Sequence, residues 1–226
     1  MTHPLDRPVW NSLISHRAPF ALGDGPARRF TPQIGPLTGA VDASPESLAA
    51  IAALPCDEAG LLSLEADPVP APPGMTVAVE AVGVQMVADR LIPADSDLAW
   101  INLTDDDAAE MLALATLTKP GPFAAETHRL GQFIGVKQDG VLIAMAGERM
   151  RLPGFTEVSG VCTHPDHRGK GYAAALMRAV MARIIATGET PFLHAYASNT
   201  GAIALYETLG FRVRRQMAVT GLVKAG

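Results

Sequence analysis

Residues 155–187 have the pattern of a strand, a loop with two glycines and a helix in direct succession. The stretch FTEVSGVCT at 155–163 alternates between apolar and polar residues, which is the two-residue period of a β-strand. From about residue 169 to 187 apolar residues recur at helical spacing, and Gly188 is a stop signal. This apolar stripe consists of Ala173, Leu176, Met177, Val180, Met181 and Ile184. A helix with one such stripe must bury it, so we expect it to pack on a sheet.

The neighbouring segments extend this sheet. Strand-like runs on both sides of Asp139 and Gly140 predict a hairpin with a type I′ turn, because these residue types tolerate positive φ. The elements expected after residue 190 are a strand at 191–198, a helix between the cap Asn199 and the stop Gly210, and a strand at 211–219. Helices and strands alternate while a hairpin is also present, so the predicted fold class is α/β with a mixed sheet.

A proline-rich segment divides the first part of the chain. DPVPAPPG at 67–74 has four prolines in eight residues and can be neither a helix nor a central strand. Before it, Ser44 caps a predicted helix, and after it the valine-rich run 75–88 predicts a strand. A short strand and a helix capped by Thr104 follow. This repeated order of cap, helix and proline stop favours two related halves.

Charge and cysteine content exclude several classes of function. A net charge of −5 with 48% hydrophobic residues is typical of a soluble globular protein and argues against nucleic acid or an anionic membrane as partner. We interpret Arg28, Arg29 and the arginines at 212–215 as exposed strand charge. The start of the chain lacks the pattern of a signal peptide, so we expect a cytoplasmic location. Cys56 and Cys162 are too few for a disulfide framework and wrongly spaced for zinc, so we expect no metal.

The glycine loop predicts a ligand that carries phosphate. The first N–H groups of a helix have no intrahelical partner, the helix dipole is positive there, and glycines let an anion approach the backbone. A P-loop is excluded because Lys170 is followed by Gly171 instead of Ser or Thr. A dinucleotide fingerprint is matched by Gly169, Gly171 and Ala174, but the next strand ends in HAYAS, without the acidic residue that the fingerprint needs.

The loop also fits a third pattern. Arg168, Gly171 and Ala173 satisfy the Arg/Gln-x-x-Gly-x-Gly/Ala signature of the GNAT superfamily of acyl-CoA-dependent N-acyltransferases. TEVSGVCTHPDHRGKGYAAALM resembles that family's core strand, loop and pyrophosphate helix, and NTGAIALYETLGF resembles its next motif. The resemblance covers about residues 96–226, which we interpret as a GNAT N-acetyltransferase domain. Residues 1–95 lack a glycine loop and resemble the smaller, degenerate N-terminal half of a GNAT subgroup with two consecutive halves.

The resemblance implies acetyl-CoA as co-substrate, with no metal. It implies that strands 155–163 and 191–197 splay into a V-shaped slot, where the pantetheine arm pairs with exposed backbone as an added strand would. The pyrophosphate would bind the N–H groups at the helix start. Asn199 caps its helix on any interpretation, and the resemblance adds a contact to pantetheine. The candidate contacts for the co-substrate are Val161, Cys162, Thr163, Arg168, Gly169, Lys170, Gly171, Tyr172, Ala173 and Asn199.

Glu157 and Tyr206 are the candidate catalytic residues. An alkylammonium with a pKa of about 10.4 is almost entirely protonated at neutral pH, so its attack on a thioester needs assisted deprotonation. Glu157 lies four residues before Val161 on the same strand face, which makes it the candidate general base, direct or through water; the alternative is a solvated strand charge. Tyr206 matches the family's usual acid for the leaving thiolate, and its alternative role is core packing. The Val161 N–H is the candidate oxyanion donor.

Other polar residues are expected to be structural. Cys162 has no sequence-adjacent base to activate it and is predicted to be a buried thiol. His164 and His167 lack the further ligands that a metal would need. His194, inside a strand, is interpreted as a satisfied core or slot-lining histidine.

The leading hypothesis is an N-acetyltransferase that transfers acetyl from acetyl-CoA to a primary amine in a direct ternary complex. A non-catalytic acyl-CoA sensor and a dinucleotide-binding oxidoreductase are the alternatives. The acceptor stays open between a protein N-terminus, an amino acid, an aminoglycoside and a polyamine. We therefore expect a small-molecule or peptide amine as partner, with neither nucleic acid nor membrane, and leave a homodimer open.

Overall fold

The computed structural model of the chain describes residues 3–93 and 98–226. The predicted boundary between residues 95 and 96 therefore lies outside the described residues. The described strands form a single 11-stranded sheet. In sheet order the strands are β1 (Ala21–Leu22), β2 (Ala27–Phe30), β3 (Leu37–Ala40), β4 (Leu61–Glu65), β11 (Arg212–Lys224), β5 (Met75–Val87), β10 (Thr190–Tyr196), β9 (Phe155–Thr163), β8 (Val141–Leu152), β7 (Phe133–Gln138) and β6 (Ile101–Leu103).

Five α-helices accompany the sheet in the described part of the chain. They are α1 (Pro8–Leu13), α2 (Pro45–Ala53), α3 (Ala108–Thr118), α4 (Tyr172–Ala186) and α5 (Thr200–Thr208). Short 3₁₀ turns lie at Pro4–Asp6, Ala18–Phe20, Asp105–Asp107, Thr127–Leu130 and Pro165–His167. Strand β9 pairs in parallel with β10, and β3 with β4, whereas the other pairs are antiparallel. The predicted mixed α/β sheet is confirmed.

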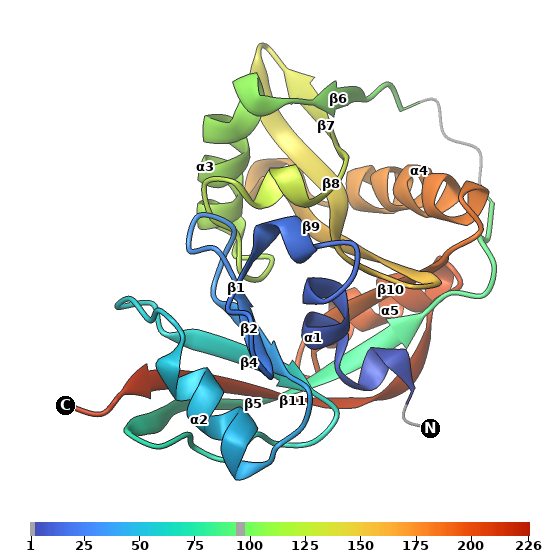
Figure 1. Cartoon of the computed structure of the whole chain (residues 1–226). Coiled ribbons are helices and arrows are strands. Elements are labelled where there is room, and N and C mark those ends of the chain that lie inside the picture. Colours follow the sequence, from blue (N-terminus) through green and yellow to red (C-terminus); the bar gives the residue numbers. More distant parts are fainter. Residues whose placement is uncertain (1–2, 94–97) are drawn as a thin grey trace.

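Helices α3 and α4 cover opposite faces of β8 and β9 (Figure 1). The predicted stripe of α4 is buried against one face, where it meets Ala144 and Ala146. Met145, between these two alanines, points to the other face and packs in a cluster with α3. Because successive side chains of a strand point to opposite faces, β8 contributes to two hydrophobic clusters, one on each face of the sheet. These clusters hold β8 in place beside β9, the strand that leads into the glycine loop.

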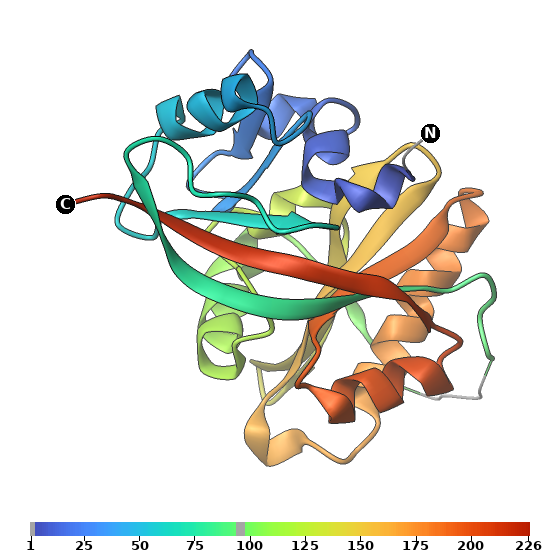
Figure 2. The ribbon, with the colours of Figure 1, turned by 90° about the horizontal axis from the view of Figure 1, so that it is seen from below.

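Strand β5 joins the first part of the chain to the second. It lies between β10 and β11, pairing antiparallel with both. Figure 2 shows β5 and β11 running side by side as two long curved strands across the molecule. Residues 1–95 and 96–226 therefore contribute interleaved strands to one sheet. Their assignment as two separate domains stays a prediction.

The N-terminal helix α1 reaches both parts of this sheet. It packs against β3 and β4 on one side and against β8 on the other. Its approach to β3 is close: a Cβ on Gly39 would lie 2.6 Å from the backbone nitrogen of Trp10. A glycine is therefore needed where the helix crosses the strand.

Several predicted elements are confirmed in detail. Asp139 (φ 51°) and Gly140 (φ 81°) both have the left-handed conformation that a type I′ turn requires. The Ser44 side chain accepts a hydrogen bond from the N–H of Ser47 at the start of α2. The valine-rich run forms β5, and the strand predicted at 155–163 is β9.

Other expectations were wrong. Helix α4 begins at Tyr172 instead of about residue 169, because Gly169 and Gly171 have positive φ and belong to the loop. We expected Thr104 to cap the α-helix itself, but it caps the 3₁₀ turn Asp105–Asp107 that leads into α3. We expected Arg29 and Arg214 to be exposed, but Arg29 is only 1% exposed and Arg214 is largely buried. Both donate hydrogen bonds to partners, and a buried arginine is stable only when it is paired in this way. The pattern did not predict α1 or β1–β4, whose two to six residues are too short to show a period.

Candidate active site

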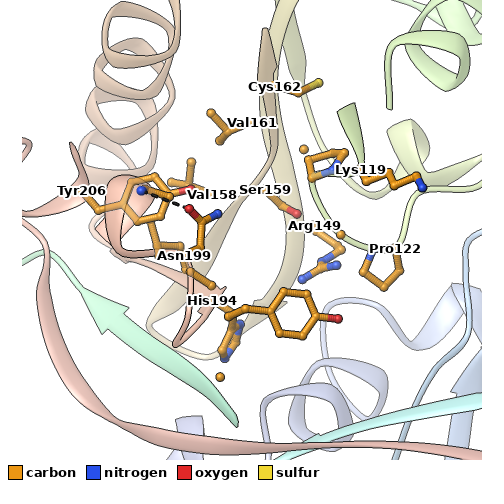
Figure 3. A pocket seen from close by; sticks show the side chains of 18 of the residues that line it. Lys119, Pro122, Arg149, Val158, Ser159, Val161, Cys162, His194, Asn199 and Tyr206 are labelled. Atoms are coloured by element: carbon orange, nitrogen blue, oxygen red, sulfur yellow. Dashed lines mark hydrogen bonds between the residues drawn. The ribbon is translucent and has the colours of Figure 1, made fainter. Parts of the chain in front are cut away.

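Strands β9 and β10 separate where the predicted slot lies. They pair only between Phe155–Glu157 and Thr190–Phe192. Beyond this point β10 stays paired with β5, whereas β9 continues to Thr163 without a strand on that side. This confirms the V-shaped opening. A cavity of about 630 Å³ fills it, lined by residues of β9, β10 and α5, the connection after α3, and strands β3 and β4 (Figure 3).

The glycine loop presents free backbone donors at the start of α4. The first helical hydrogen bond runs from the N–H of Ala175 to the carbonyl of Gly171 at 3.1 Å. Among the described residues, the N–H groups from Gly169 to Ala174 have no hydrogen-bond partner. The N–H of Arg168, a candidate contact for the co-substrate, donates to the carbonyl of Pro165. A row of unpaired N–H groups at the positive end of a 15-residue helix is an arrangement that favours an anion.

Strand β9 is distorted at Gly160, where it lines the cavity. Gly160 has φ 63°, and the register with β8 shifts beside it. A side chain would not fit there, since a Cβ on Gly160 would lie 2.6 Å from the Phe133 ring. Val161 and Thr163 are half-buried and line the cavity, as do Arg168 and Ala173 at the end of the slot. The predicted contacts Gly169–Tyr172 lie beyond the cavity lining, on the exposed loop and the first residue of α4.

Helix α5 supplies Asn199 and Tyr206 to the opposite wall. The Asn199 Oδ1 accepts a hydrogen bond from the N–H of Ala202 at 3.3 Å, so the predicted cap is confirmed (Figure 3). Tyr206 lines the cavity and packs its ring edge-on against Phe211. Burial raises the pKa of the Tyr206 hydroxyl, which therefore keeps its proton at neutral pH.

Glu157 is buried at the base of the slot, so the alternative of a solvated strand charge is wrong. Its side chain is 1% exposed and forms two hydrogen bonds of 2.8 Å with Nε and Nη2 of Arg149. The N–H of Met150 and Nδ1 of His194 complete its set of donors. Burial by itself would raise the pKa of Glu157, but the charge and hydrogen bonds of Arg149, with the help of His194, outweigh it and hold this pKa at about 2.

The same contacts define the protonation of His194. Gln85 on β5 donates through Nε2 to the Leu5 carbonyl, and its Oε1 accepts from Arg214, which fixes the orientation of the amide. The Gln85 Nε2 therefore also faces Nε2 of His194 as a donor, at 3.0 Å. The ring must accept there and donate at Nδ1 to Glu157, which is the neutral imidazole. His194 is both satisfied and slot-lining, as predicted.

The thiol of Cys162 has the buried setting that we expected. The Cys162 thiol is buried in the cluster under α3, and burial, opposed by a hydrogen bond with Thr118, raises its pKa to about 11. Such a thiol is a poor nucleophile at neutral pH. His164 and His167 stack edge to face at 5.7 Å. Within residues 3–93 and 98–226 no group of three or more His, Cys, Asp or Glu could hold a metal ion.

The sequence reasoning missed residues that shape the inner end of the cavity. They are Arg149, Gln85 and the leucines Leu37, Leu62 and Leu64. Counting back along the hairpin from the pair Leu152 and Phe155 would place Met150 opposite Glu157, and only a register shift between Glu148 and Arg151 brings Arg149 there, which the sequence does not indicate. Nothing in the local pattern indicated that strands more than 90 residues earlier would line the same cavity.

Comparison with known proteins decides the family. The model of the FR47-like protein family matches residues 133–219, which include β9, the glycine loop and α5. The crystal structure of a protein assigned to the GNAT family of acetyltransferases, from Novosphingobium aromaticivorans, is 48% identical over 100% of both chains, with a TM-score of 0.92. The chain belongs to the GNAT family.

More distant GNAT structures share the fold. A GCN5-related N-acetyltransferase from Kribbella flavida is 18% identical, with a TM-score of 0.62 over 96% of both chains. A tandem GNAT protein from the clavulanic acid biosynthesis pathway is 14% identical, with a TM-score of 0.50 over 74% of this chain and 64% of that one. No curated protein gives a significant match. No helix in the described part of this GNAT protein is long and apolar enough to cross a membrane.

Proposed function

We propose that this GNAT protein transfers an acetyl group from acetyl-CoA to a primary amine, in a ternary complex and without a covalent enzyme intermediate. One observation carries the proposal: unpaired N–H groups at the start of α4 open onto a slot that leads to a cavity with a protonated tyrosine. We propose a cytoplasmic enzyme that acts on a small-molecule or peptide amine, and we leave its oligomeric state open.

The co-substrate would lie along the slot. Its diphosphate would accept hydrogen bonds from the N–H groups of Gly169–Ala174, with Lys170 and Arg168 adding positive charge. Its pantetheine arm would pair with the edge of β9 that has no strand partner, next to Val161 and Thr163. This arrangement brings the thioester to the inner cavity, close to the bulge at Gly160.

The reaction would proceed by direct attack. The amine nitrogen forms a bond to the thioester carbonyl carbon, and the oxyanion that develops accepts a hydrogen bond from the Val161 N–H. The carbon–sulfur bond then breaks, and the thiolate takes a proton from Tyr206, whose hydroxyl burial keeps protonated. The proton lost by the amine balances the one that Tyr206 gave up. The buried, high-pKa thiol of Cys162 supports transfer without an acyl-enzyme.

Glu157 remains our prediction for the general base. A carboxylate with a pKa of about 2 that already accepts hydrogen bonds from Arg149, Met150 and His194 is a weak proton acceptor. We therefore propose that it acts through water on an amine of modest basicity. An α-amino group with a pKa near 8 is roughly one-tenth neutral at pH 7 and fits this limit better than an alkylamine.

Release of CoA thiol from acetyl-CoA in the presence of an amine panel tests the proposal. We expect Tyr206→Phe to lower kcat by roughly a hundredfold with unchanged affinity for CoA, because only the proton donor is lost. Tyr196→Phe, which removes another hydroxyl from the cavity lining, is the matched control and should keep more activity. Binding of acetyl-CoA with no thiol release for any amine would favour the non-catalytic sensor.

A further inference from the structure

We propose that the acceptor is a small amine with an apolar side chain and a carboxylate or amide oxygen, and that Arg149 binds this oxygen. The inference rests on the proposed function and names the substrate class of the same site. Three features of the inner cavity limit the acceptor: a polar donor, the lack of a free counter-charge among the described lining residues, and an apolar surface.

The polar donor is Nη1 of the Arg149 guanidinium. The side chain is 10% exposed, and its Nε and Nη2 are held by Glu157. Its Nη1 has no hydrogen-bond partner among the described residues, although Arg149 lines the cavity. Figure 3 shows Arg149 pointing into the cavity between Ser159 and Pro122. Because the N–H groups of Nη1 are accessible from the cavity, a ligand oxygen placed there gains a charge-assisted hydrogen bond.

The described residues that line this cavity offer no free negative charge. Glu157 is the only carboxylate among the described residues that line it, and its hydrogen-bond positions are taken by Arg149, Met150 and His194. Lys119 and Arg168 also belong to the lining, with the Lys119 side chain extending away from Arg149 (Figure 3). A polyamine or an aminoglycoside would bring several ammonium groups with no carboxylate to pair them, which is unfavourable away from water.

The apolar surface comes from the first part of the chain. Leu37 on β3 and Leu62 and Leu64 on β4 line the cavity, and we call them the leucine wall. Val219 on β11 continues it. Apolar surface that faces a cavity favours a ligand group that removes it from water, at about 25 cal/mol per Å². The leucine wall therefore favours an acceptor with an aliphatic or aromatic side chain over glycine-like amines.

Four amines test this on the wild-type protein: leucine, leucinamide, 3-methylbutylamine and spermidine. Rates of CoA thiol release are compared as kcat/KM corrected for the neutral fraction of each amine. We expect leucine or leucinamide to exceed 3-methylbutylamine by roughly ten- to a hundredfold, which corresponds to one hydrogen bond to a charged group. The better of the two oxygen-bearing amines identifies carboxylate or amide. Equal rates with 3-methylbutylamine, or a preference for spermidine, would overturn the proposal.

Two variants locate the effect. Arg149→Lys keeps a charge for Glu157 but removes Nη1, and should reduce the preference for oxygen-bearing amines to less than about threefold. Arg151→Lys is the matched control, because Arg151 lies two residues further along β8, pairs with Glu189 and is not part of the cavity lining. It should keep the wild-type preference. A full preference in Arg149→Lys would remove Arg149 from acceptor binding.

A binding measurement separates this proposal from the proposed function. Thermal unfolding of the CoA complex is followed with leucine, leucinamide or 3-methylbutylamine added. If leucine or leucinamide stabilises the complex, 3-methylbutylamine does not, and no thiol is released from acetyl-CoA, the transferase function is refuted and the acceptor site is supported. If these amines give no turnover and also do not stabilise the complex, the proposed acceptor site is overturned.

Discussion

Glu65 on β4 is a buried carboxyl whose ionisation opposes folding. Its side chain is 4% exposed, and neither oxygen has a hydrogen-bond partner. The nearest cation is Nη1 of Arg7, 3.7 Å from Oε2. Burial raises the pKa of Glu65 from 4.5 to about 8, and the charge of Arg7 only partly opposes this.

The sign and size of the effect follow from linkage. Between pH 4.5 and 8 the folded protein holds the Glu65 proton and the unfolded chain does not, so the free energy of unfolding falls as the pH rises through this window. At pH 7 the pH lies about 2.5 units above the pKa of Glu65 in the unfolded chain and still below its pKa in the folded protein. At about 1.4 kcal/mol per unit, this lowers the free energy of unfolding by about 3 to 4 kcal/mol. At pH 5 the same calculation leaves less than about 1 kcal/mol.

Glu65→Gln removes this titration, and we expect its effect to grow with pH. The free energy of unfolding of the variant, relative to the wild type, should rise by about 2 to 3 kcal/mol between pH 5 and pH 7, measured by urea unfolding. The difference between two pH values cancels any constant cost of the buried amide. Glu80→Gln, an exposed position on β5, is the control and should show no such rise. A pH-independent difference for Glu65→Gln would refute the reasoning.

Two further predictions concern the binding of CoA and the general base. Gly171→Ala should weaken CoA binding, measured by calorimetry, by at least about tenfold. An alanine in the left-handed conformation costs about 1–2 kcal/mol, and its methyl group would lie where the diphosphate approaches. Gly188→Ala, a glycine with a similar positive φ at the other end of α4, is the control and should bind CoA normally. Glu157→Gln should lower kcat by roughly a hundredfold while the KM for acetyl-CoA stays constant, and an unchanged kcat in steady-state assays would exclude Glu157 as base.

The sequence predicted the parts of the molecule whose signals are local. The hairpin at Asp139 and Gly140, the strand β9 and the Asn199 cap all depend on residues within a few positions of each other. The glycine loop was recognisable for the same reason. Its exact helix start was not, because the pattern does not show which of the residues around Gly171 has left the helical region.

The inner cavity depends on tertiary contacts, which no local pattern encodes. Glu157 has the sequence setting of a solvated strand charge, yet it is buried because Arg149 crosses from the neighbouring strand. The tautomer of His194 depends on Gln85, 109 positions earlier, and on the Leu5 carbonyl that orients it. Charge pairing and burial at such separations appear only once the chain has folded.

Calorimetry with CoA and with pantetheine tests the central claim most directly, namely that the N–H groups of Gly169–Ala174 bind the diphosphate of the co-substrate. The two ligands share the arm that would lie along β9, and only CoA carries the diphosphate. We predict that CoA binds at least about tenfold more tightly than pantetheine, since charge-assisted hydrogen bonds to the loop are lost without the diphosphate. Equal affinities, or no heat with CoA, would contradict the account.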